Sequence, residues 1–256
     1  MVKTAKTFRT ASSGQLLIVA ALAIAIVIVS TSIYIYEVTT QTQSVENNSM
    51  VELAIAVKTG IRNAVISALA NITNGGQKTI LAENLDMLAR AYMQLHPQKP
   101  CLTFYTLLNG TGYEDGVKLL WDADGLGVSS AHVFFTLKVL EPASNITIND
   151  AINITTVLKL DGYTVNENEN VKIVNLTCKV LNEGKPAQAK QIAVYWEQAP
   201  KLWVPVQSPY IADLGNGTYT ISFIITAVSD ILHVSAHVVD ARNIFAIANA
   251  TCTQAD

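Results

Sequence analysis

The sequence predicts a chain of three structural parts: an N-terminal transmembrane helix, an α+β region with two helices and an antiparallel sheet, and an all-β sandwich. Three observations predict this order. One uncharged apolar run lies near the N-terminus, two stretches with helical periodicity follow it, and the rest of the chain alternates apolar and polar residues between short turns. The predicted boundaries are 1–14 for a basic leader, 15–37 for the transmembrane helix, 38–160 for the α+β region and 161–256 for the sandwich.

Charge is distributed unevenly along the 256 residues, whose net charge is −3. Lys3, Lys6 and Arg9 are the only charged residues before Glu37, so the chain from Glu37 onward holds 14 of the 17 basic residues and all 20 acidic ones, a net charge of −6. A surface of that sign repels nucleic acid and anionic lipid. We therefore expect no nucleic-acid partner for the body of the protein.

The apolar run from Leu16 to Tyr36 has the length of one membrane crossing. It holds 21 residues, and a helix that rises about 1.5 Å per residue needs about 20 residues to cross the bilayer core. Tyr34 and Tyr36 lie where an interfacial aromatic belt is expected, and the basic residues before the run predict a cytoplasmic N-terminus. The sequence therefore predicts a single-pass protein of the cell membrane whose bulk is extracellular.

Two kinds of processing would change this result. The apolar region of a signal peptide is usually about 7–15 residues, shorter than this run, although Ser30 and Ser32 satisfy the small-residue rule for cleavage before Ile33. The stretch SSGQLLIVAALAIAIVIV also resembles the processing region of archaeal type IV pilin-like proteins, in which a short basic leader ends at a glycine and the apolar helix is retained. The resemblance implies cleavage between Gly14 and Gln15, and a helix that stays in lipid or packs against copies of itself in a filament.

Sequons of the form N-x-S/T lie beyond the apolar run, and none lies before it. In NITINDAINITTVLKL the apolar residues occupy one strand face while Asn145 and Asn153 occupy the other, as the two-residue period of a strand requires. N-glycosylation needs acceptors that face solvent, so the pattern predicts a glycosylated extracellular surface. The eight candidate acceptors are Asn47, Asn71, Asn109, Asn145, Asn153, Asn175, Asn216 and Asn249.

The region 38–160 begins with helical periodicity. Every fourth residue from Leu53 to Leu69 is apolar, which predicts an amphipathic helix, and the polar stretch 38–48 before it either continues the first helix or breaks it at ENNS. A second helix over 81–95 follows the NGG turn and ends before HPQKP. Four β-rich runs between turns then predict an antiparallel sheet. The resemblance to pilin-like proteins implies this layout for their heads.

The last part, from about Asp161, shows about seven short strands with turns every 8 to 12 residues or so, which predicts an immunoglobulin-like sandwich. It resembles the Ig-like modules of prokaryotic surface proteins through LTCKVLNEGKPA, Trp196, DLGNGTYTISF and SAHVVDARN. Cys178 and Cys252 both fall in strands of this part, and an oxidising exterior favours a disulfide between them worth about 2–4 kcal/mol. In that case Cys101 has no disulfide partner. The alternatives in which Cys101 pairs with Cys178 or with Cys252 stay open.

No stretch carries a catalytic or metal-binding motif: G-x-S-x-G, H-E-x-x-H, P-loop and dinucleotide fingerprints are all missing from the sequence. His233 and His237 are about 13 Å apart on a strand that rises about 3.3 Å per residue, too far to share one zinc ion, so we expect surface histidines. DADG at 122–125 lacks the further carboxylates of a calcium loop, which predicts an ordinary acidic turn. We therefore predict no enzyme activity, no catalytic residue, no metal and no cofactor.

Two functional hypotheses follow. The first is a glycosylated archaeal surface protein, a pilin-like structural and adhesion subunit whose partners are membrane lipid and copies of itself through the N-terminal helix. The second is a membrane-tethered binding protein that forms no filament and recognises an extracellular sugar, peptide or surface-layer protein. Ser13 favours the second, because pilin-like leaders usually carry Lys or Arg at that place. A third hypothesis, a surface hydrolase, lacks a catalytic constellation.

Overall fold

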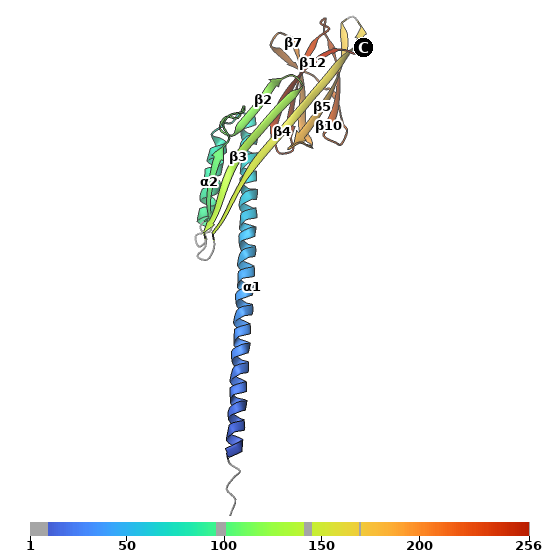
Figure 1. The fold of residues 1–256 in the computed structure, drawn as a ribbon. Helices are drawn as coiled ribbons and strands as arrows, with labels where there is room; N and C mark the ends of the chain where they lie inside the picture. Colours follow the sequence, from blue (N-terminus) through green and yellow to red (C-terminus); the bar gives the residue numbers. More distant parts are fainter. Residues whose placement is uncertain (1–9, 96–100, 141–144, 169, 256) are drawn as a thin grey trace, which may run out of the picture. The chain divides into compact units, whose positions relative to one another are not determined.

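The structure is a computed structural model of the chain (Figure 1), and it describes residues 10–95, 101–140, 145–168 and 170–255. For some residues in these ranges only the backbone is described, namely 10–24, 26, 38–50, 101, 102, 140, 145 and 146. The chain divides into two compact units, Met1–Ile55 and Ala56–Asp256.

Helix α1, Thr10–Thr73, is one continuous helix of 64 residues. The sequence predicts separate helices at 15–37 and 53–69, with a link that either continues or breaks. In the structure the link is helical, so the two predicted helices are parts of one. The physical reason is that the chain has no Gly or Pro from Gln15 to Thr59, and nothing in the link interrupts the hydrogen-bond ladder.

Within Met1–Ile55, the described apolar side chains of α1 are exposed except for Leu53 and Ala54, which are half-buried. The segment Val27–Glu37 is apolar but shorter than a membrane span, and the side chains of 15–24 lie outside the described ones, so the predicted crossing at 15–37 stays a prediction. Tyr34 and Tyr36 are exposed as well. The aliphatic side chains that retain 57–64% of their accessible surface are Val27, Ile28, Val29, Ile33 and Ile35.

A different part of α1, Val51–Thr73, is long and apolar enough to cross a membrane, with a mean hydropathy of 1.4. Its apolar face is already covered by the protein, since Val57, Ile61 and Val65 are buried in the unit Ala56–Asp256. The four-residue periodicity in the sequence therefore marks the core helix of that unit.

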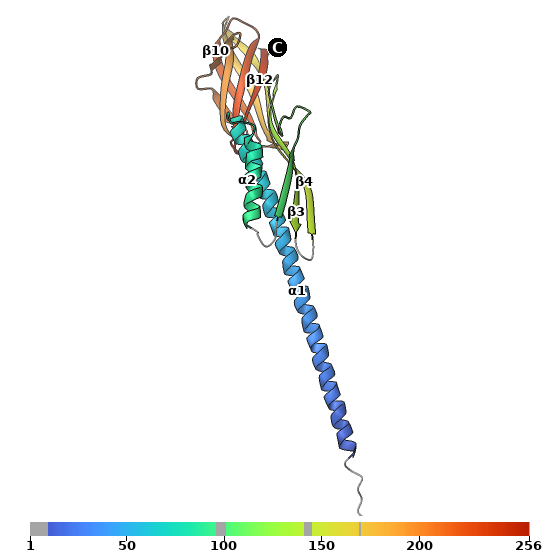
Figure 2. The same ribbon diagram turned by 90° about the vertical axis from the view of Figure 1, so that its left-hand side faces the viewer.

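The turn after α1 and the helix α2, Ile80–Leu95, follow the sequence prediction. Gly75 has a φ of 99°, a left-handed conformation that glycine adopts without strain at a helix end. Leu81 of α2 is fully buried. Tyr92 Oη donates to Ala56 O of α1 at 2.9 Å, so the last turns of α1 and the helix α2 lie side by side (Figure 2).

Strands β1, β2 and β3 form an antiparallel sheet with the first half of β4, and the last turns of α1 together with α2 cover one face of it (Figures 1 and 2). On β3, buried Phe135 and Leu137 alternate with exposed Phe134 and Lys138, so the covered face is apolar. The strand bounds are β1 Cys101–Leu107, β2 Val117–Ala123, β3 Leu126–Leu140 and β4 Asn145–Asn168.

The remaining strands form two antiparallel ribbons with the orders β4-β5-β10-β9 and β8-β7-β11-β12, which a short parallel pairing of β12 with β4 joins. Inward side chains of both ribbons, such as Leu176 and Val234, share one hydrophobic core. The predicted order, helices first and then mostly antiparallel strands, is confirmed. The bounds are β5 Val171–Asn182, β6 Lys185–Pro186, β7 Ala189–Ala199, β8 Leu202–Pro205, β9 Tyr210–Asp213, β10 Thr218–Thr226, β11 Leu232–Asp240 and β12 Phe245–Gln254.

Strand β4 belongs to both sheets, because it pairs with β3 over residues 145–159 and with β5 over residues 156–168. The domain boundary expected between 160 and 161 therefore falls inside a continuous strand. The structure does not divide there, since Ala56–Asp256 is one compact unit. Asp161 and Gly162 look like a turn in the sequence, but cross-strand pairing on β5 keeps them extended.

A charge network ties the β11–β12 turn to β4 and to α1. Asp240 is fully buried, and its carboxylate accepts hydrogen bonds from Arg242 Nε at 3.0 Å and from Thr156 Oγ1 at 2.9 Å. Arg242 also donates to Glu183 at 2.7 Å, and Glu183 lies 3.7 Å from Arg62 of α1. The buried carboxylate is thus fully paired, as a buried charge must be.

Candidate functional site

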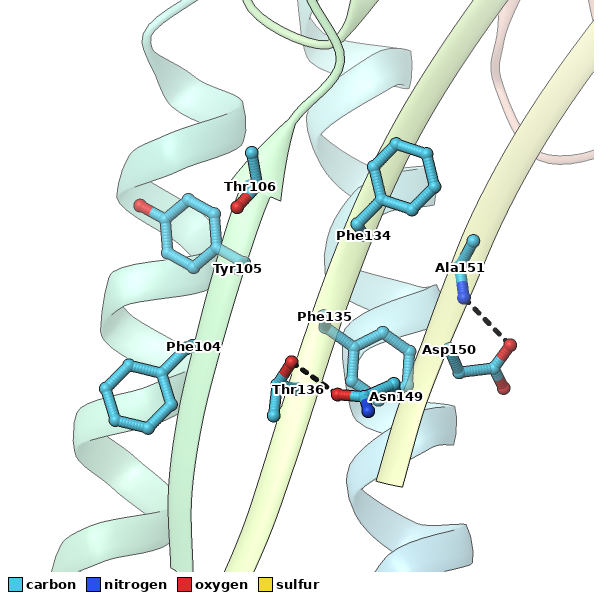
Figure 3. Close-up of a pocket in the computed structure, with 9 residues that line it drawn as sticks. All are labelled: Phe104, Tyr105, Thr106, Phe134, Phe135, Thr136, Asn149, Asp150 and Ala151. Atoms are coloured by element: carbon cyan, nitrogen blue, oxygen red, sulfur yellow. Dashed lines mark hydrogen bonds between the residues drawn. The ribbon is translucent and has the colours of Figure 1, made fainter. Parts of the chain in front are cut away.

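One depression lies on the β1–β3–β4 sheet (Figure 3). Phe104 and Phe134 are 54% and 46% exposed, and together with Thr136 and Asn149 they line a shallow hollow of about 400 Å³. Thr136 Oγ1 donates to Asn149 Oδ1 at 2.7 Å. Because these polar groups already bond to each other, the two phenyl rings are the main feature of this surface.

A second depression, which we call the aromatic groove, lies on the outer face of the β8-β7-β11-β12 ribbon. It consists of two adjoining hollows of about 380 and 330 Å³. One wall is the tip of the β2–β3 hairpin, and the other is formed by β8 and the end of β7. The residues that define the groove are Trp121, Asp122, Tyr195, Glu197, Trp203 and Asn249.

The strand period places the floor of the groove on one face. On β7, Tyr195 follows buried Val194, and on β11, His237 precedes buried Val238. Asn249 alternates in the same way with the buried alanines of β12. The side chains between the buried positions therefore point away from the core and towards the groove.

The β2–β3 hairpin is fixed against β12, which makes its tip a stable wall. Gly125 N donates to Asn249 O at 2.6 Å. Gly127 leaves no room for a side chain, because a Cβ there would lie 1.9 Å from Ile247 O. The close approach of the two backbones therefore depends on glycine at this position.

Ring contacts hold the aromatic side chains of the groove. Tyr195 lies 4.4 Å from His237 between ring centroids, and His237 lies 5.5 Å from Phe245. Trp121 packs edge-on against Phe245 at 5.4 Å and donates from Nε1 to Ser129 Oγ at 3.0 Å. A binding surface whose rings are already held in place loses less side-chain entropy on binding.

The groove carries uncompensated negative charge. Asp122, Asp124 and Glu197 line it, and neither Lys nor Arg is found among its described lining residues. Burial lowers the pKa of His237 below its ordinary value of 6.5, so this imidazole is neutral near pH 7 and adds no positive charge. Aromatic faces and carboxylates are thus combined in one open depression.

The groove shows no metal-binding geometry. Among the described residues, no group of three or more His, Cys, Asp and Glu is placed to hold a metal ion. His233 and His237 lie on strand β11, as expected, but only His233 is exposed, because His237 is packed between two rings. The acidic turn expected at 122–125 forms the tip of the β2–β3 hairpin, where Gly125 has a φ of 71°.

Exposure differs among the predicted glycosylation acceptors. Asn153 follows the predicted alternation, since it is exposed between two buried isoleucines of β4. Asn175 is half-buried, and the side chains of Asn47 and Asn145 lie outside the described ones. The exposed acceptors are Asn71, Asn109, Asn153 and Asn216.

Asn249 is a special case among the acceptors. Its side chain is half-buried in the aromatic groove, and its Nδ2 donates to Trp121 O at 3.3 Å. A glycan attached to that nitrogen would fill the groove. Glycosylation of Asn249 and ligand binding in the groove therefore exclude each other.

The disulfide predicted between Cys178 and Cys252 is not formed in the structure, which holds both as free thiols. Cys178 lies opposite Tyr219 on β10, and Cys252 lies opposite Leu232 on β11, so each is packed among apolar side chains of its own ribbon. Burial raises the pKa of both thiols to about 12. The side chain of Cys101 lies outside the described ones.

Other predicted positions fall in the N-terminal part of the chain. Gly14 and Gln15, the expected cleavage site, lie in α1 where only the backbone is described. Residues 1–9 of the expected leader lie outside the described residues.

Sequence reasoning missed the aromatic groove. The local signal that was present is Trp121, which stands directly before the acidic turn and so places a ring and two carboxylates on one hairpin tip. The other wall, with Trp203, comes from a distant part of the chain. Periodicity predicts which face of a strand is polar, but it does not predict which strands meet.

In comparisons with known proteins, no family model, no curated protein and no solved structure matches this chain.

Proposed function

We propose that this chain is a single-pass, glycosylated archaeal cell-surface protein, a pilin-like structural and adhesion subunit without a catalytic role. The N-terminal part of α1 lies in the membrane or packs against copies of itself. The unit Ala56–Asp256 is the extracellular head.

The hydroxyl groups in the exposed apolar segment carry this proposal. Thr31 Oγ1 donates to Val27 O at 2.5 Å, and Ser32 Oγ donates to Ile28 O at 2.8 Å. Lipid offers no hydrogen-bond partner, so a hydroxyl in it must bond within its own helix. Each large aliphatic side chain that leaves water gains about 1.5–3 kcal/mol. The segment is therefore suited to an apolar surrounding.

The residues on either side of this segment support the proposed orientation. Lys3, Lys6 and Arg9 precede it, and positive charge next to a span favours the cytoplasmic side. Tyr34 and Tyr36, both exposed, lie at its C-terminal end, where an interfacial aromatic belt is expected.

The order of the strands supports an immunoglobulin-like sandwich as the outer part of the head. The ribbon β4-β5-β10-β9 corresponds to the strand order A-B-E-D, and β8-β7-β11-β12 corresponds to C′-C-F-G. Trp196 packs against the core from β7, which takes the place of strand C. Such a module serves as a binding or spacing unit, and its function depends on the site that it carries.

Two measurements on native cell surfaces test the proposal. We expect a mature N-terminus at Gln15, and sheared fibres that an antibody against the head labels in negative-stain microscopy. Labelled membranes without fibres would contradict the filament. An N-terminus at Ile33 in secreted protein would contradict both the filament and the anchor.

The aromatic groove favours a second candidate function, a membrane-tethered binding protein that forms no filament. Its expected mature N-terminus is Met1, with label on membranes alone. The variant Trp203→Ala, which removes one wall of the groove, tests the binding role that this candidate requires. It should lower attachment of cells to their target while leaving the amount of surface protein unchanged.

A further inference from the structure

We propose that the aromatic groove binds lysine or arginine side chains of an extracellular protein partner. This inference rests on the binding role of the head in the proposed function, and it does not depend on whether α1 forms a filament.

The carboxylates of the groove have unused acceptor capacity. Asp124 Oδ1 accepts from Thr251 N at 3.1 Å, and Glu197 Oε1 accepts from Lys201 N. Among the described residues, none donates to the second oxygen of either carboxylate or to exposed Asp122. An ammonium or guanidinium group supplies the donors and the charge that these oxygens lack.

The rings of the groove provide the second part of a cation site. Trp203 is 39% exposed in one wall, Trp121 stands in the other, and Tyr195 lies on the floor. A cation within about 6 Å of a ring centroid is attracted to the negative face of the ring, most strongly for Trp. The aliphatic stem of Lys or Arg covers apolar ring surface while its charged end reaches a carboxylate.

The head contains contacts between a lysine and an aromatic ring at two other places. Lys118 Nζ lies 5.8 Å from the ring centroid of Tyr113, and Lys138 Nζ lies 5.7 Å from that of Phe104. These two pairs satisfy one ring in the β1–β2 connection and one ring on β1 with cations of the same chain. The rings of the aromatic groove have carboxylates beside them instead of lysines, so the cation must come from a partner.

The sign of the charge selects among ligand classes. A neutral sugar ring would stack on Trp203 and donate hydroxyl hydrogen bonds to the carboxylates, but it brings no positive charge to three carboxylates that have no Lys or Arg among the described lining residues. An acidic glycan is repelled. Carboxylates occur in both adjoining hollows, since Asp122 lines both and Glu197 lines the second, which suits two basic side chains on one segment.

Tryptophan fluorescence of the full-length chain in a nonionic polyoxyethylene detergent tests the inference, because Trp121 and Trp203 are two of the three tryptophans. The probe is acetyl-Lys-Gly-Lys-amide, and the control is the same peptide with norleucine in place of lysine. We expect saturable quenching by the lysine peptide alone. Raising NaCl from about 20 to about 500 mM should weaken this binding several-fold.

Conservative variants locate the binding. Asp122→Asn combined with Glu197→Gln should lower the affinity roughly 5- to 10-fold, and Trp203→Ala should lower it roughly 2- to 5-fold. The matched control is Glu83→Gln, which removes an exposed carboxylate of α2 and should change nothing. Equal thermal midpoints for all variants show that the fold is kept.

Four outcomes would overturn the inference. The first is equal quenching by the norleucine peptide, and the second is binding that the double variant leaves unchanged. The third is saturable binding of neutral oligosaccharides that depends on Trp203, which keeps the binding role of the head but assigns a different ligand class. A glycan on Asn249 of the native protein also overturns it, and leaves the anchoring role of α1 untouched.

Discussion

The two ends of helix α1 consist of the same residue types but have opposite surroundings. Around Ile28 the aliphatic side chains are exposed, whereas around Ile61 they are buried within the head. The two parts of the helix differ in what packs against their apolar side chains. The C-terminal turns of α1 pack against α2 and the strands of the same chain (Figures 1 and 2), while in the proposed function the exposed part meets lipid or another helix. The same hydrophobic composition stabilises the fold at one end and, in the proposed function, directs association at the other.

Introducing charged residues into the exposed part of α1 should have the largest effect, which is on membrane or fibre association. Val27→Asp combined with Ile28→Asp should release the chain from the membrane or fibre fraction, because each Asp costs about 3 kcal/mol near the centre of a membrane span. The head should keep its stability to within about 0.5 kcal/mol. Cell fractionation with immunoblotting and thermal unfolding measure the two quantities. Retention of the double variant in membranes, like that of a Val27→Leu, Ile28→Leu control, would contradict the assigned role of this segment.

Removing the buried carboxylate of Asp240 tests how strongly the charge network holds the C-terminal turns of α1 to the strands. Asp240→Ala removes the buried carboxylate that accepts from Arg242 Nε and Thr156 Oγ1, leaves Arg242 only its contacts with Glu183 and β4, and should lower the free energy of unfolding by about 3–5 kcal/mol. Denaturant unfolding followed by circular dichroism measures this value. Glu167→Ala, at an exposed position, is the control and should fall within about 0.5 kcal/mol of the parent. Similar losses in both variants would mean that the network is not needed.

A pair of alanine variants in the same helix sharpens the comparison. Leu69→Ala opens a cavity in the core and should cost about 2–5 kcal/mol. Ile55→Ala, at a side chain that is 60% exposed, should cost no more than about 0.5 kcal/mol. The measurement is again denaturant unfolding, and equal costs would show that α1 does not depend on the strands for its stability.

The smallest expected effect is a pH dependence at the surface of the head. The hydrogen bond from Lys58 and that from its own backbone neighbour Ala151 hold the pKa of Asp150 below its ordinary value of 3.8. The pair therefore stabilises the fold above about that pH and loses its effect as the pH falls through the lowered pKa. The exposed geometry limits the gain to less than about 1 kcal/mol.

Thermal midpoints between pH 6 and pH 2, measured for the parent and for Asp150→Asn, test this dependence. The difference between the two proteins should shrink as the pH falls. A constant difference over the whole range would contradict the role of Asp150.

The sequence predicts the local elements well and their assembly poorly. The period from Leu53 to Leu69 predicts a buried helical face, and the alternation around Asn153 predicts a half-exposed strand. Local patterns of this kind depend on the geometry of one element. The continuation of β4 through Gly162 depends instead on hydrogen bonds from β5, which no local pattern contains.

The candidate site was unpredictable for the same reason. Trp121 and Trp203 form opposite walls of one groove because the β2–β3 hairpin crosses to β12, a contact that depends on Gly127. In the sequence this glycine is one of several in turn-like stretches. The cysteines are a second example, since Cys178 and Cys252 lie in one shared core but the structure holds both as free thiols, and the β12–β4 pairing joins their ribbons.

Strand β4 has a mechanical consequence. An adhesive or filamentous protein, as proposed for this chain, is pulled along its length. Strand β4 has 24 residues and is hydrogen-bonded to β3 over 145–159 and to β5 over 156–168, so tension along it loads these bonds in shear. Many hydrogen bonds then have to rupture together, whereas a hairpin loaded at one end unzips bond by bond. In the proposed function, the strand that the two sheets share would carry force from the outer ribbons to the β1–β3–β4 sheet within one continuous element.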